Sequence, residues 1–497
     1  MKARFSSKLG AVLSLVSVLQ MTHAQTQIGN DIDGEAANNW SGKSISMPNE
    51  TTIAIGAQSN DDVASGAGHV RIFEWNNSAW VQKGNDIDGR SAFDAAGTIV
   101  SMPDANTVAF GVPGNAQSTN PFGRVEIHTW NGSSWVQKGT DINGISPGER
   151  FGYSVSMPDP NTIAIGSNGA PTWTTNPAGQ VYVYEWSGTD WVQKGATILG
   201  QNSGDQFGYY VTMPDENTVA ASAPFNDNAF NDAGQTRIYQ WDGSNWTQKG
   251  TDLLGEASGD NSGWSICMPD NSTIAIGAPK NAGGGFWNGH TRIYSWDGSS
   301  WLQKGTDIDG SAIGDLSGSA LSMPESNTIA IGAPGHNGGV PLQGQVRVFS
   351  WNGASWNQTG SDIIGEAQDD ESGSAVAMPS SSIVAVGAYE NEGNGNAAGH
   401  VRIYSMDGQV GLTDARTMGN SVKIGPNPAG DFLHIELAER EDQLAISILS
   451  LDGKHVWTQH LMNVNEADVR FECTPGIYLV QVSTQHETLL TSRIIKN

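Results

Sequence analysis

Six carboxylates recur at one position of a repeated sequence unit, and their type and spacing suggest a chemical role. They follow one another at intervals of 55 residues, once 56, and Asn39 occupies the same position in the first of the seven copies. The six are Asp94, Glu149, Asp205, Asp260, Asp315 and Asp370. A ring of carboxylates would hold Ca²⁺, which takes oxygen ligands, or a cationic group. Alternatively, each side chain only accepts hydrogen bonds from backbone N–H groups of its own turn. We favour this structural role, because a feature repeated in every copy serves the scaffold, whereas binding sites usually break symmetry.

Catalytic groups find little support in the sequence. Three histidines share one repeat position at the start of a predicted strand, where other copies carry arginine or glutamine; they are His69, His290 and His400. A position filled in this way is a polar strand start and not a base beside a nucleophile. Cys267 stands where other copies have serine or threonine, which indicates a buried thiol and not a reactive one. We therefore predict no catalytic residue, and Ca²⁺ at the six carboxylates is the one cofactor that the sequence leaves open.

Aromatic side chains in the variable loops are the candidates for ligand contacts. Each copy has one long loop that differs from the others, and variable loops on a rigid frame are where binding usually occurs. Aromatic rings suit the faces of sugars or the contact points of protein partners. The alternative is that they fold back and wedge the loops together. The candidates are Trp173, Phe225, Phe230, Phe286, Trp287 and Tyr389.

All of these residues belong to a unit that recurs seven times. A Met-Pro pair begins at residues 47, 102, 157, 213, 268, 323 and 378. In the first six copies a pair of tryptophans five residues apart follows, as in Trp75 and Trp80, and most copies then have Gln-Lys-Gly, as at 82–84. Self-similarity at a fixed period is the signature of a repeat architecture.

The fifth copy shows the strand pattern of the unit. Strands are predicted over 264–267, 272–278, 291–296 and 301–305, with a Met-Pro-Asp-Asn turn at 268–271 and an Asp-Gly hairpin turn at 297–298. Four antiparallel strands per copy without a helix are typical of β-propeller blades. We predict an all-β chain in which residues 25–408 form a seven-bladed β-propeller and a small β-sandwich follows.

Strand order within a blade decides where the candidate residues lie. If the four strands run from the axis to the rim, the loops between second and third strands share a face with the connections between blades. The six carboxylates precede the innermost strand, so we expect them to ring the mouth of the channel, with the aromatic loops beside them. The tryptophan pairs are expected to pack against the neighbouring blade.

The ends of the repeat region predict how the ring closes. The seventh copy stops near Gly408, before its second tryptophan and its Gln-Lys-Gly segment. Residues 25–29 match the missing piece, with Gln27 and Gly29 on the Gln and Gly positions. We expect this segment to pair as the outer strand of the seventh blade and to remove an open sheet edge. Gln25 and Met406 replace the two tryptophans, which predicts that this joint is the weakest in the ring.

The net charge indicates which partners are unfavourable, and the N-terminal residues indicate where the protein is located. The 497 residues hold 25 Lys+Arg against 51 Asp+Glu, a net charge of −26, and such a surface repels phosphate, so nucleic acid is a poor partner. Residues 1–24 combine Lys2, Arg4 and Lys8 with a short apolar run and a small-residue cleavage site, which is typical of a secretory signal peptide. We expect the mature chain to start at Gln25 and to contain no membrane span.

The repeat unit resembles FG-GAP repeats, the blade type of the integrin α-chain propeller. The resemblance covers residues 25–408 and lies in Phe151-Gly152 and Phe207-Gly208 before the inner strand, and in Gly-Ala-Pro at 277–279 and 332–334. The integrin family binds Ca²⁺ through acidic loops that join the first two strands. The loops here, such as 213–218, lack an Asp-x-Asp-x-Asp-Gly ladder, so the resemblance does not carry the calcium sites over.

A second domain follows a linker over 409–420. Residues 421–497 are rich in strand patterns and resemble the C-terminal sorting domain of the Bacteroidetes type IX secretion system. The matching residues are Pro426, Asn427, Pro428, Asp452, Gly453, Lys454, Gly476, Tyr478 and Lys496. The resemblance implies export to the periplasm and passage across the outer membrane by the type IX machinery. The alternative is an ordinary small β-sandwich without a role in export.

Together these features predict an exported, non-catalytic binding or adhesion propeller that is secreted or displayed at the cell surface. Its ligand would be an extracellular protein or glycan. One alternative is a secreted carbohydrate-active enzyme with its site at the mouth of the channel. Another is a purely structural component of the cell surface.

Overall fold

The computed structural model describes residues 25–114, 118, 121–169 and 178–406, and the strands 422–425, 432–449, 455–470, 476–483 and 488–496. The chain divides into two compact units, Met1–Val410 and Gly411–Asn497. Every element of the described residues is a β-strand, which confirms the predicted all-β class. The described residues contain no helix that could cross a membrane. The predicted signal peptide and linker, and Trp173, lie outside the described residues.

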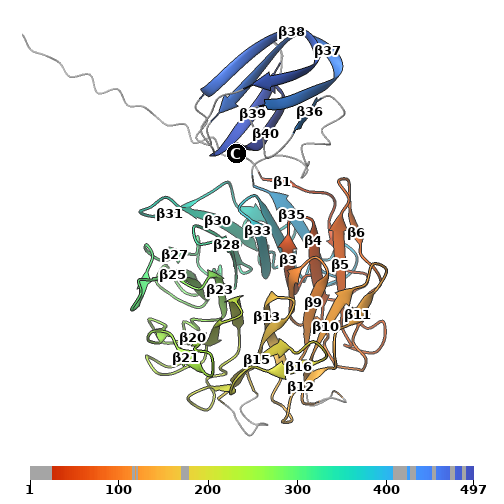
Figure 1. Cartoon of the computed structure of the whole chain (residues 1–497). Helices are drawn as coiled ribbons and strands as arrows, with labels where there is room; N and C mark the ends of the chain where they lie inside the picture. The colour runs from red at the N-terminus through yellow and green to blue at the C-terminus, as the bar shows by residue number, and fades with distance from the viewer. Residues whose placement is uncertain are drawn as a thin grey trace, which may run out of the picture. The chain divides into compact units, whose positions relative to one another are not determined.

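The first unit is a ring of seven antiparallel sheets, one for each sequence repeat (Figure 1). Blade 1 consists of β3 (Ser44–Asn49), β4 (Thr52–Ala57), β5 (His69–Trp75), β6 (Trp80–Gln82) and β7 (Ile87–Asp88). Blade 2 consists of β8 (Val100–Asp104), β9 (Thr107–Val112), β10 (Arg124–Trp130), β11 (Trp135–Gln137) and β12 (Ile142–Asn143). Blade 3 consists of β13 (Phe151–Asp159), β14 (Thr162–Ser167), β15 (Gln180–Trp186), β16 (Trp191–Gln193) and β17 (Ile198–Leu199).

The remaining blades repeat this order. Blade 4 consists of β18 (Val211–Asp215), β19 (Thr218–Ala223), β20 (Gln235–Trp241), β21 (Trp246–Gln248) and β22 (Leu253–Leu254). Blade 5 consists of β23 (Ser265–Asp270), β24 (Thr273–Ala278), β25 (His290–Trp296), β26 (Trp301–Gln303) and β27 (Ile308–Asp309). Blade 6 consists of β28 (Ala320–Glu325), β29 (Thr328–Ala333), β30 (Gln345–Trp351), β31 (Trp356–Gln358) and β32 (Ile363–Ile364). Blade 7 consists of β33 (Ala375–Ser380), β34 (Ile383–Ala388), β35 (His400–Ser405), β1 (Thr26–Gln27) and β2 (Ile32–Asp33).

The outer edge of each blade differs from the prediction, because it contains two short strands instead of one. In blade 1, β6 and β7 both pair with β5, and the chain between them passes through Gly84 at φ 81°. A left-handed residue there breaks the strand in two, which shortens the exposed edge that other chains could pair with.

The predicted Met-Pro turn is wrong, because these residues belong to the first strand of each blade. Met268 and Pro269 lie inside β23, and the register of β23 against β24 shifts between Cys267 and Asp270. Proline lacks the N–H that a regular ladder needs, and this irregularity accommodates it. The methionine side chains are buried between blades: Met102, for example, is 5% exposed and belongs to one apolar cluster with Ile72 of the preceding blade.

The core lies between neighbouring blades. The second strand of each blade is buried along its whole length, because a sheet covers each of its faces. Each described second tryptophan of a pair donates its indole N–H to a backbone carbonyl of the preceding blade, as Trp301 does to Lys249 at 2.9 Å. The Lys249 ammonium in turn donates to the Asn271 carbonyl of the next blade at 2.6 Å. The predicted packing of the tryptophan pairs between blades is therefore correct.

The N-terminal segment closes the ring as predicted. β1 pairs with β35, with Thr26 opposite Ser405 and Gln27 opposite Tyr404. β2 pairs with the other half of β35. The hydroxyl of Ser361 in blade 6 donates to the Gln25 side chain at 2.7 Å. The ring is continuous, because β3 adjoins both β8 and β33.

The second unit is a five-stranded sheet. Its strands are β36 (Val422–Gly425), β37 (Phe432–Leu449), β38 (His455–Arg470), β39 (Gly476–Ser483) and β40 (Thr488–Lys496). β37 pairs with β36, β38 and β39, and its buried side chains include Leu444, Ile446 and Ile448. Of the residues that suggested a sorting domain, Gly476 and Tyr478 lie in β39, and Lys496 pairs with Gly476. The segments with 426–428 and 452–454 lie outside the described residues.

Candidate ligand site at the mouth of the channel

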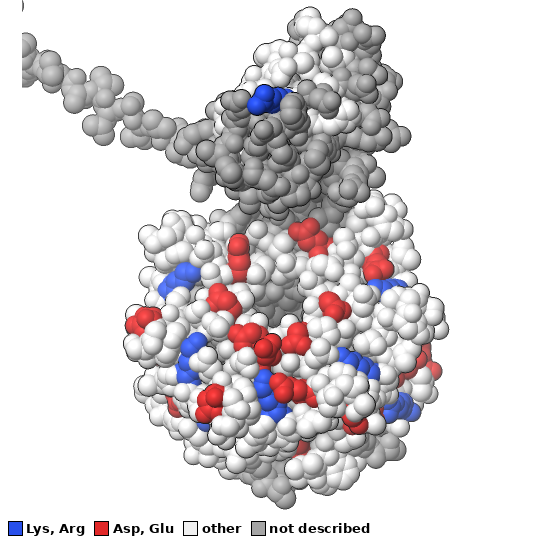
Figure 2. Space-filling view, viewed as in Figure 1, with Lys and Arg blue, Asp and Glu red and all other residues white. Residues whose placement is uncertain are grey.

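A cavity of about 500 Å³ lies where the innermost strands begin, and residues from all seven blades line it. One face of the ring, drawn in Figure 2, has a hollow at its centre and more acidic than basic side chains around it. One repeat position contributes a lining residue from every blade, and we call it the channel position. It is occupied by Lys43, Thr98, Tyr153, Tyr209, Trp264, Ser319 and Ser374.

The channel position breaks the symmetry of the ring. Three neighbouring blades carry aromatic rings there, and the centroid of Tyr209 lies 5.2 Å from that of Tyr153 and 5.0 Å from that of Trp264. Phe225, from a variable loop, adds a fourth ring 6.1 Å from Tyr209. We call these four residues the aromatic arc. At this position the other four blades have only hydroxyls and one ammonium, and we call this the polar side of the cavity, although Ile99, Leu321 and Val376 also line the cavity there.

A second repeat position contributes Ala95 and Arg150 to the lining of the larger cavity, and Leu316 and Glu371 to that of the smaller one. Its seven residues all have a left-handed backbone although none is glycine; they are Trp40, Ala95, Arg150, Gln206, Asn261, Leu316 and Glu371. Such a conformation is strained for an L-residue and persists only where surrounding contacts fix it. The contact is visible at Ala95, whose N–H donates to the Gly66 carbonyl of the preceding blade at 3.0 Å. Among the side chains, the Arg150 guanidinium lies over the Tyr153 ring, 4.4 Å from its centroid.

The polar side of the site contains a compact group around Tyr389. The Lys43 ammonium lies 3.6 Å from the centroid of the Tyr389 ring, and the Tyr389 hydroxyl donates to Glu371 at 2.6 Å. Burial lowers the pKa of Lys43 and raises the pKa of Tyr389. These three residues, with Trp264 and Lys280, line a second cavity of about 240 Å³. A ligand there would meet two ammonium groups, one carboxylate and two aromatic rings.

The six predicted carboxylates are buried in separate turns and do not line either cavity. Each accepts backbone N–H bonds in its own turn, as Asp370 does from Glu366 and Ala367 at 2.8 Å each. Its other oxygen often takes a side chain from the next loop, such as Asn391 at 3.0 Å. Among the described residues, none of the three groups that could hold a metal ion includes any of the six. This arrangement matches the structural interpretation of the carboxylates.

The predicted aromatic residues fall into two sets. Tyr389 lines the smaller cavity, whereas Phe225 packs against Tyr209 and Trp264 and is not among the residues that line either cavity. Phe230, Phe286 and Trp287 are exposed in the loops, and Phe286 stacks on Trp287 with 4.6 Å between centroids. The sequence interpretation missed Tyr153, Tyr209 and Trp264 as candidate ligand contacts, and it assigned Trp264 to the first strand of its blade. The available signal was that aromatic residues replace serine, threonine and lysine at one repeat position.

The histidine position lies at the start of the third strands, away from both cavities. Burial, with a smaller effect of the nearby Arg71, lowers the pKa of His69 to about 4. Burial likewise lowers the pKa of His290. Cys267 is half-buried as a residue, but its sulfur is desolvated, which raises the pKa of the thiol to about 12. A thiol with this pKa is not a nucleophile at neutral pH.

Comparison with known proteins identifies the C-terminal unit. Residues 423–497 match the model of a secretion system C-terminal sorting domain. No curated protein matches the chain in sequence. Among solved structures, the β-propeller domain of the Trilobed protease from Pyrococcus furiosus is 10% identical, with a TM-score of 0.38 over 69% of this chain and 90% of that chain. The WD40 β-propeller domain of Doa1 is 11% identical, with a TM-score of 0.42 over 76% and 96%. The periplasmic gluconolactonase PpgL of Pseudomonas aeruginosa is 11% identical, with a TM-score of 0.42 over 82% and 95%.

The propeller assignment stands on the sheet topology of the chain itself, in which seven sheets close on one another. The localisation of the protein follows from the family match of its C-terminal domain. Because residues 423–497 are those of a secretion system C-terminal sorting domain, the chain is an exported protein of the cell surface or the extracellular medium.

Proposed function

We propose that this protein is an exported, non-catalytic binding propeller that holds a glycan at the mouth of its channel. The aromatic arc carries the proposal. Aromatic rings offer flat apolar faces that suit the C–H faces of sugar rings, and the opposite hydroxyls and ammonium are hydrogen-bond partners for sugar hydroxyls. The volume of about 500 Å³ lies within the range of small-ligand sites.

The arc is not required by the scaffold. Blades 6 and 7 have serine at the channel position and blade 2 has threonine, on the same kind of inner strand. The fold therefore does not require the large aromatic side chains of Tyr153, Tyr209 and Trp264 at this position. A feature that breaks a seven-fold repeat is what a binding site on one side of the channel would produce.

The lining of the larger cavity supports binding without catalysis. Its described residues include two cations, several hydroxyls and aromatic rings, but no carboxylate, imidazole or thiol. Glycoside hydrolysis ordinarily uses a pair of carboxyl groups on either side of the bond that is cleaved. Burial also raises the pKa of Tyr209, which keeps its phenol protonated at neutral pH.

The proposal also covers how the protein is exported and what it binds outside the cell. The C-terminal domain is the part of the chain that the type IX secretion machinery would recognise. The FG-GAP resemblance of the blades is consistent with an adhesive role, in which the propeller attaches the cell or the released protein to an extracellular glycan. The surface charge of the chain does not favour polyanionic ligands.

A glycan array with the full chain, followed by calorimetry on the best ligand, tests the proposal. Tyr209→Ser and Trp264→Ser introduce a residue already present at the channel position of other blades, so both variants should fold. We expect each to weaken binding at least tenfold, about 1.4 kcal/mol. Trp287→Ser, which removes an exposed loop ring, is the matched control and should bind as the wild type does.

Two outcomes would refute the proposal. Unchanged affinity in Tyr209→Ser and Trp264→Ser, with loss in Trp287→Ser, would move the site to the loops. Cleavage of a bound glycan by the wild type would favour the carbohydrate-active enzyme instead.

A further inference from the structure

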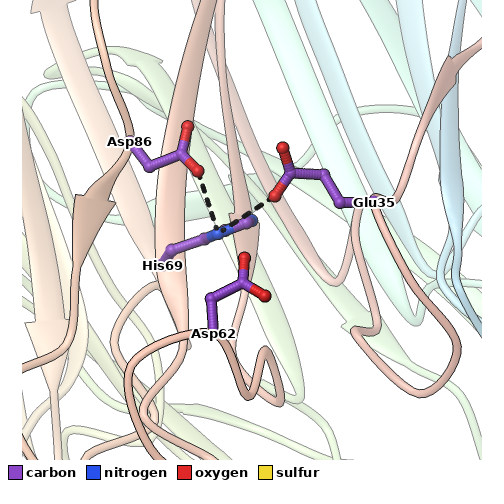
Figure 3. Close-up of side chains that lie close together, drawn as sticks. All are labelled: Glu35, Asp62, His69 and Asp86. Atoms are coloured by element: carbon purple, nitrogen blue, oxygen red, sulfur yellow. Dashed lines mark ion pairs between the residues drawn. The ribbon is translucent and has the colours of Figure 1, made fainter.

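A separate group of potential ligands lies in blade 1, outside both cavities. Glu35, Asp62, His69 and Asp86 each offer one ligand atom, and these atoms all lie within 4.8 Å of one another. Figure 3 shows the His69 ring between the three carboxylates. The His69 Nδ1 lies 3.7 Å from a carboxylate oxygen of Glu35 and 3.7 Å from one of Asp86.

The His69 imidazole has no hydrogen-bond partner. Its side chain is fully buried, with 0% exposure, and neither ring nitrogen makes a hydrogen bond. Buried polar groups almost always have a partner, so an orphaned imidazole facing carboxylates needs an explanation. The contacts of 3.7 Å are too long for hydrogen bonds but leave room for an ion, because ligand atoms that share a metal at about 2.1 Å lie roughly 3–4 Å apart.

Asp62 distinguishes this group from the other two histidine positions. His290 and His400 each have two carboxylates nearby, which gives groups of three ligands. The residues equivalent to Asp62 in those blades are Gly283 and Gly393. The loops are otherwise alike. In blades 1, 5 and 7 the backbone N–H at this position donates to the side-chain oxygen of the asparagine two residues earlier, at 2.9, 2.8 and 2.8 Å. Asp62 therefore adds a fourth ligand to an existing loop geometry.

The charges in this group are not balanced. Three carboxylates meet one guanidinium, that of Arg71, whose nearest contact with Glu35 is 3.7 Å. The equivalent arginine–glutamate pairs in blades 5 and 7 are closer, at 3.1 Å each. Glu35 thus lies between Arg71 and His69 instead of binding the arginine tightly. A divalent cation would compensate the two remaining negative charges.

We propose that Glu35, Asp62, His69 and Asp86 form a binding site for a divalent transition-metal ion, for which Zn²⁺ and Mn²⁺ are suitable probes. A buried imidazole with carboxylates is a donor set for first-row ions, whereas Ca²⁺ prefers oxygen ligands alone. Glu35 and Asp86 are partly exposed, at 38% and 24% of their side chains, which gives an ion access from solvent.

The site would link the closing segment of the ring to blade 1. Glu35 follows β2, which pairs with blade 7, whereas the other three ligands belong to the strands and loops of blade 1. A bound ion would hold these two parts of the chain together, and it should therefore raise the melting temperature.

Metal uptake by the full chain, without a histidine tag and after treatment with a chelator, tests this assignment. Calorimetry with Zn²⁺ and with Mn²⁺ gives the stoichiometry and the affinity, and the visible spectrum of the Co²⁺ form reports a nitrogen ligand. His69→Gln should fold, because glutamine occupies this position in Gln180, Gln235 and Gln345. We expect His69→Gln and Asp62→Gly each to lose one equivalent of metal, or at least tenfold in affinity.

The other blades provide matched controls. His290→Gln and His400→Gln remove the same side chain from positions that lack the fourth ligand, and they should leave metal uptake unchanged. Gly283→Asp introduces the missing carboxylate beside His290 and should add one equivalent. Its backbone is not left-handed, and the added Cβ would meet only the Asn281 side chain, at 3.0 Å.

Several results would overturn the proposal. Uptake and melting temperature that are the same in wild type, His69→Gln and Asp62→Gly would exclude the site. Binding of Ca²⁺ but of neither transition ion would show an oxygen site that does not involve His69. An unchanged stoichiometry in Gly283→Asp would remove Asp62 from the ligand set.

Discussion

Single glycines control how closely neighbouring blades approach. A Cβ added to Gly56 would lie 2.1 Å from the backbone oxygen of Gly97 in the next blade, and backbone cannot move aside as a flexible side chain can. Equivalent glycines in β24 and β29 meet a backbone oxygen at 2.0 Å each. The short distance between blades therefore requires small residues in the buried second strands; strand formation by itself does not require them.

We predict that Gly56→Ala lowers the free energy of unfolding by about 2–3 kcal/mol, the usual cost of overpacking a rigid interior. Thermal or denaturant unfolding measures it. Gly339→Ala is the control, because its Cβ would meet only the Gln343 side chain at 4.0 Å. Equal stability of the two variants would contradict this account of blade spacing.

Buried histidine predicts the direction of a pH effect. Burial, together with Arg292, lowers the pKa of His290 in the folded protein below its ordinary value of about 6.5. A folded pKa below the unfolded one means that the unfolded state binds the proton more readily. The contribution to stability is therefore complete above about pH 6.5 and is lost as the pH falls through the lower folded pKa.

We expect the melting temperature of the wild type to fall faster than that of His290→Gln between pH 7 and 4, since glutamine has no proton to gain. Melting curves of the two proteins across this range measure the difference. Parallel curves would show that His290 is not desolvated in the folded state.

At the scale of elements, the outer strands hold the blades together through their tryptophans. Trp301 lies in the three-residue strand β26, is 8% exposed and donates its indole N–H to the Lys249 carbonyl of the preceding blade. A strand this short has little stability of its own, so its position depends on this contact between blades.

Trp301→Ala should therefore destabilise the protein by about 3–5 kcal/mol, the range for a buried aromatic residue replaced by alanine. Trp301→Phe should cost less, because it retains most of the packing and loses the hydrogen bond. Leu302→Ala, next to it but 55% exposed, should change the stability by less than about 0.5 kcal/mol. Similar losses for Trp301→Ala and Leu302→Ala would exclude a special role of the tryptophan.

At the scale of the whole molecule, the ring depends on its closing strand. β1 is two residues long, and its removal would leave β35 unpaired at Tyr404 and Ser405 and the Ser361 hydroxyl without its Gln25 partner. We predict that deletion of residues 25–29 lowers the melting temperature by several degrees. Supplying a peptide of residues 25–34 should restore part of the loss. An unaltered melting temperature would contradict closure by this segment.

The sorting domain should act on the whole chain. We expect a chain that ends at residue 410 to remain in the periplasm of a host with a type IX system, while the full chain reaches the surface or the medium. Fractionation and immunodetection distinguish the two. Surface delivery of the shortened chain would show that residues 411–497 are not the export signal.

The sequence alone determined the repeat, the seven blades, the closing strand and the C-terminal domain. Each of these depends on local patterns or on a fixed period, and backbone hydrogen bonding turns such patterns into strands in the same way in every copy. The same regularity led the sequence analysis to the six repeated carboxylates, which the structure places in separate turns as hydrogen-bond acceptors.

Only the tertiary structure decided which repeat positions meet in space. Tyr153, Tyr209 and Trp264 occupy one repeat position, but only the convergence of the inner strands at the channel brings their rings into contact. His69 and Glu35 come together because the chain that closes blade 7 runs directly into blade 1. Contacts between blades arise from ring closure, and this closure is a property of the assembled sheets and not of any single repeat.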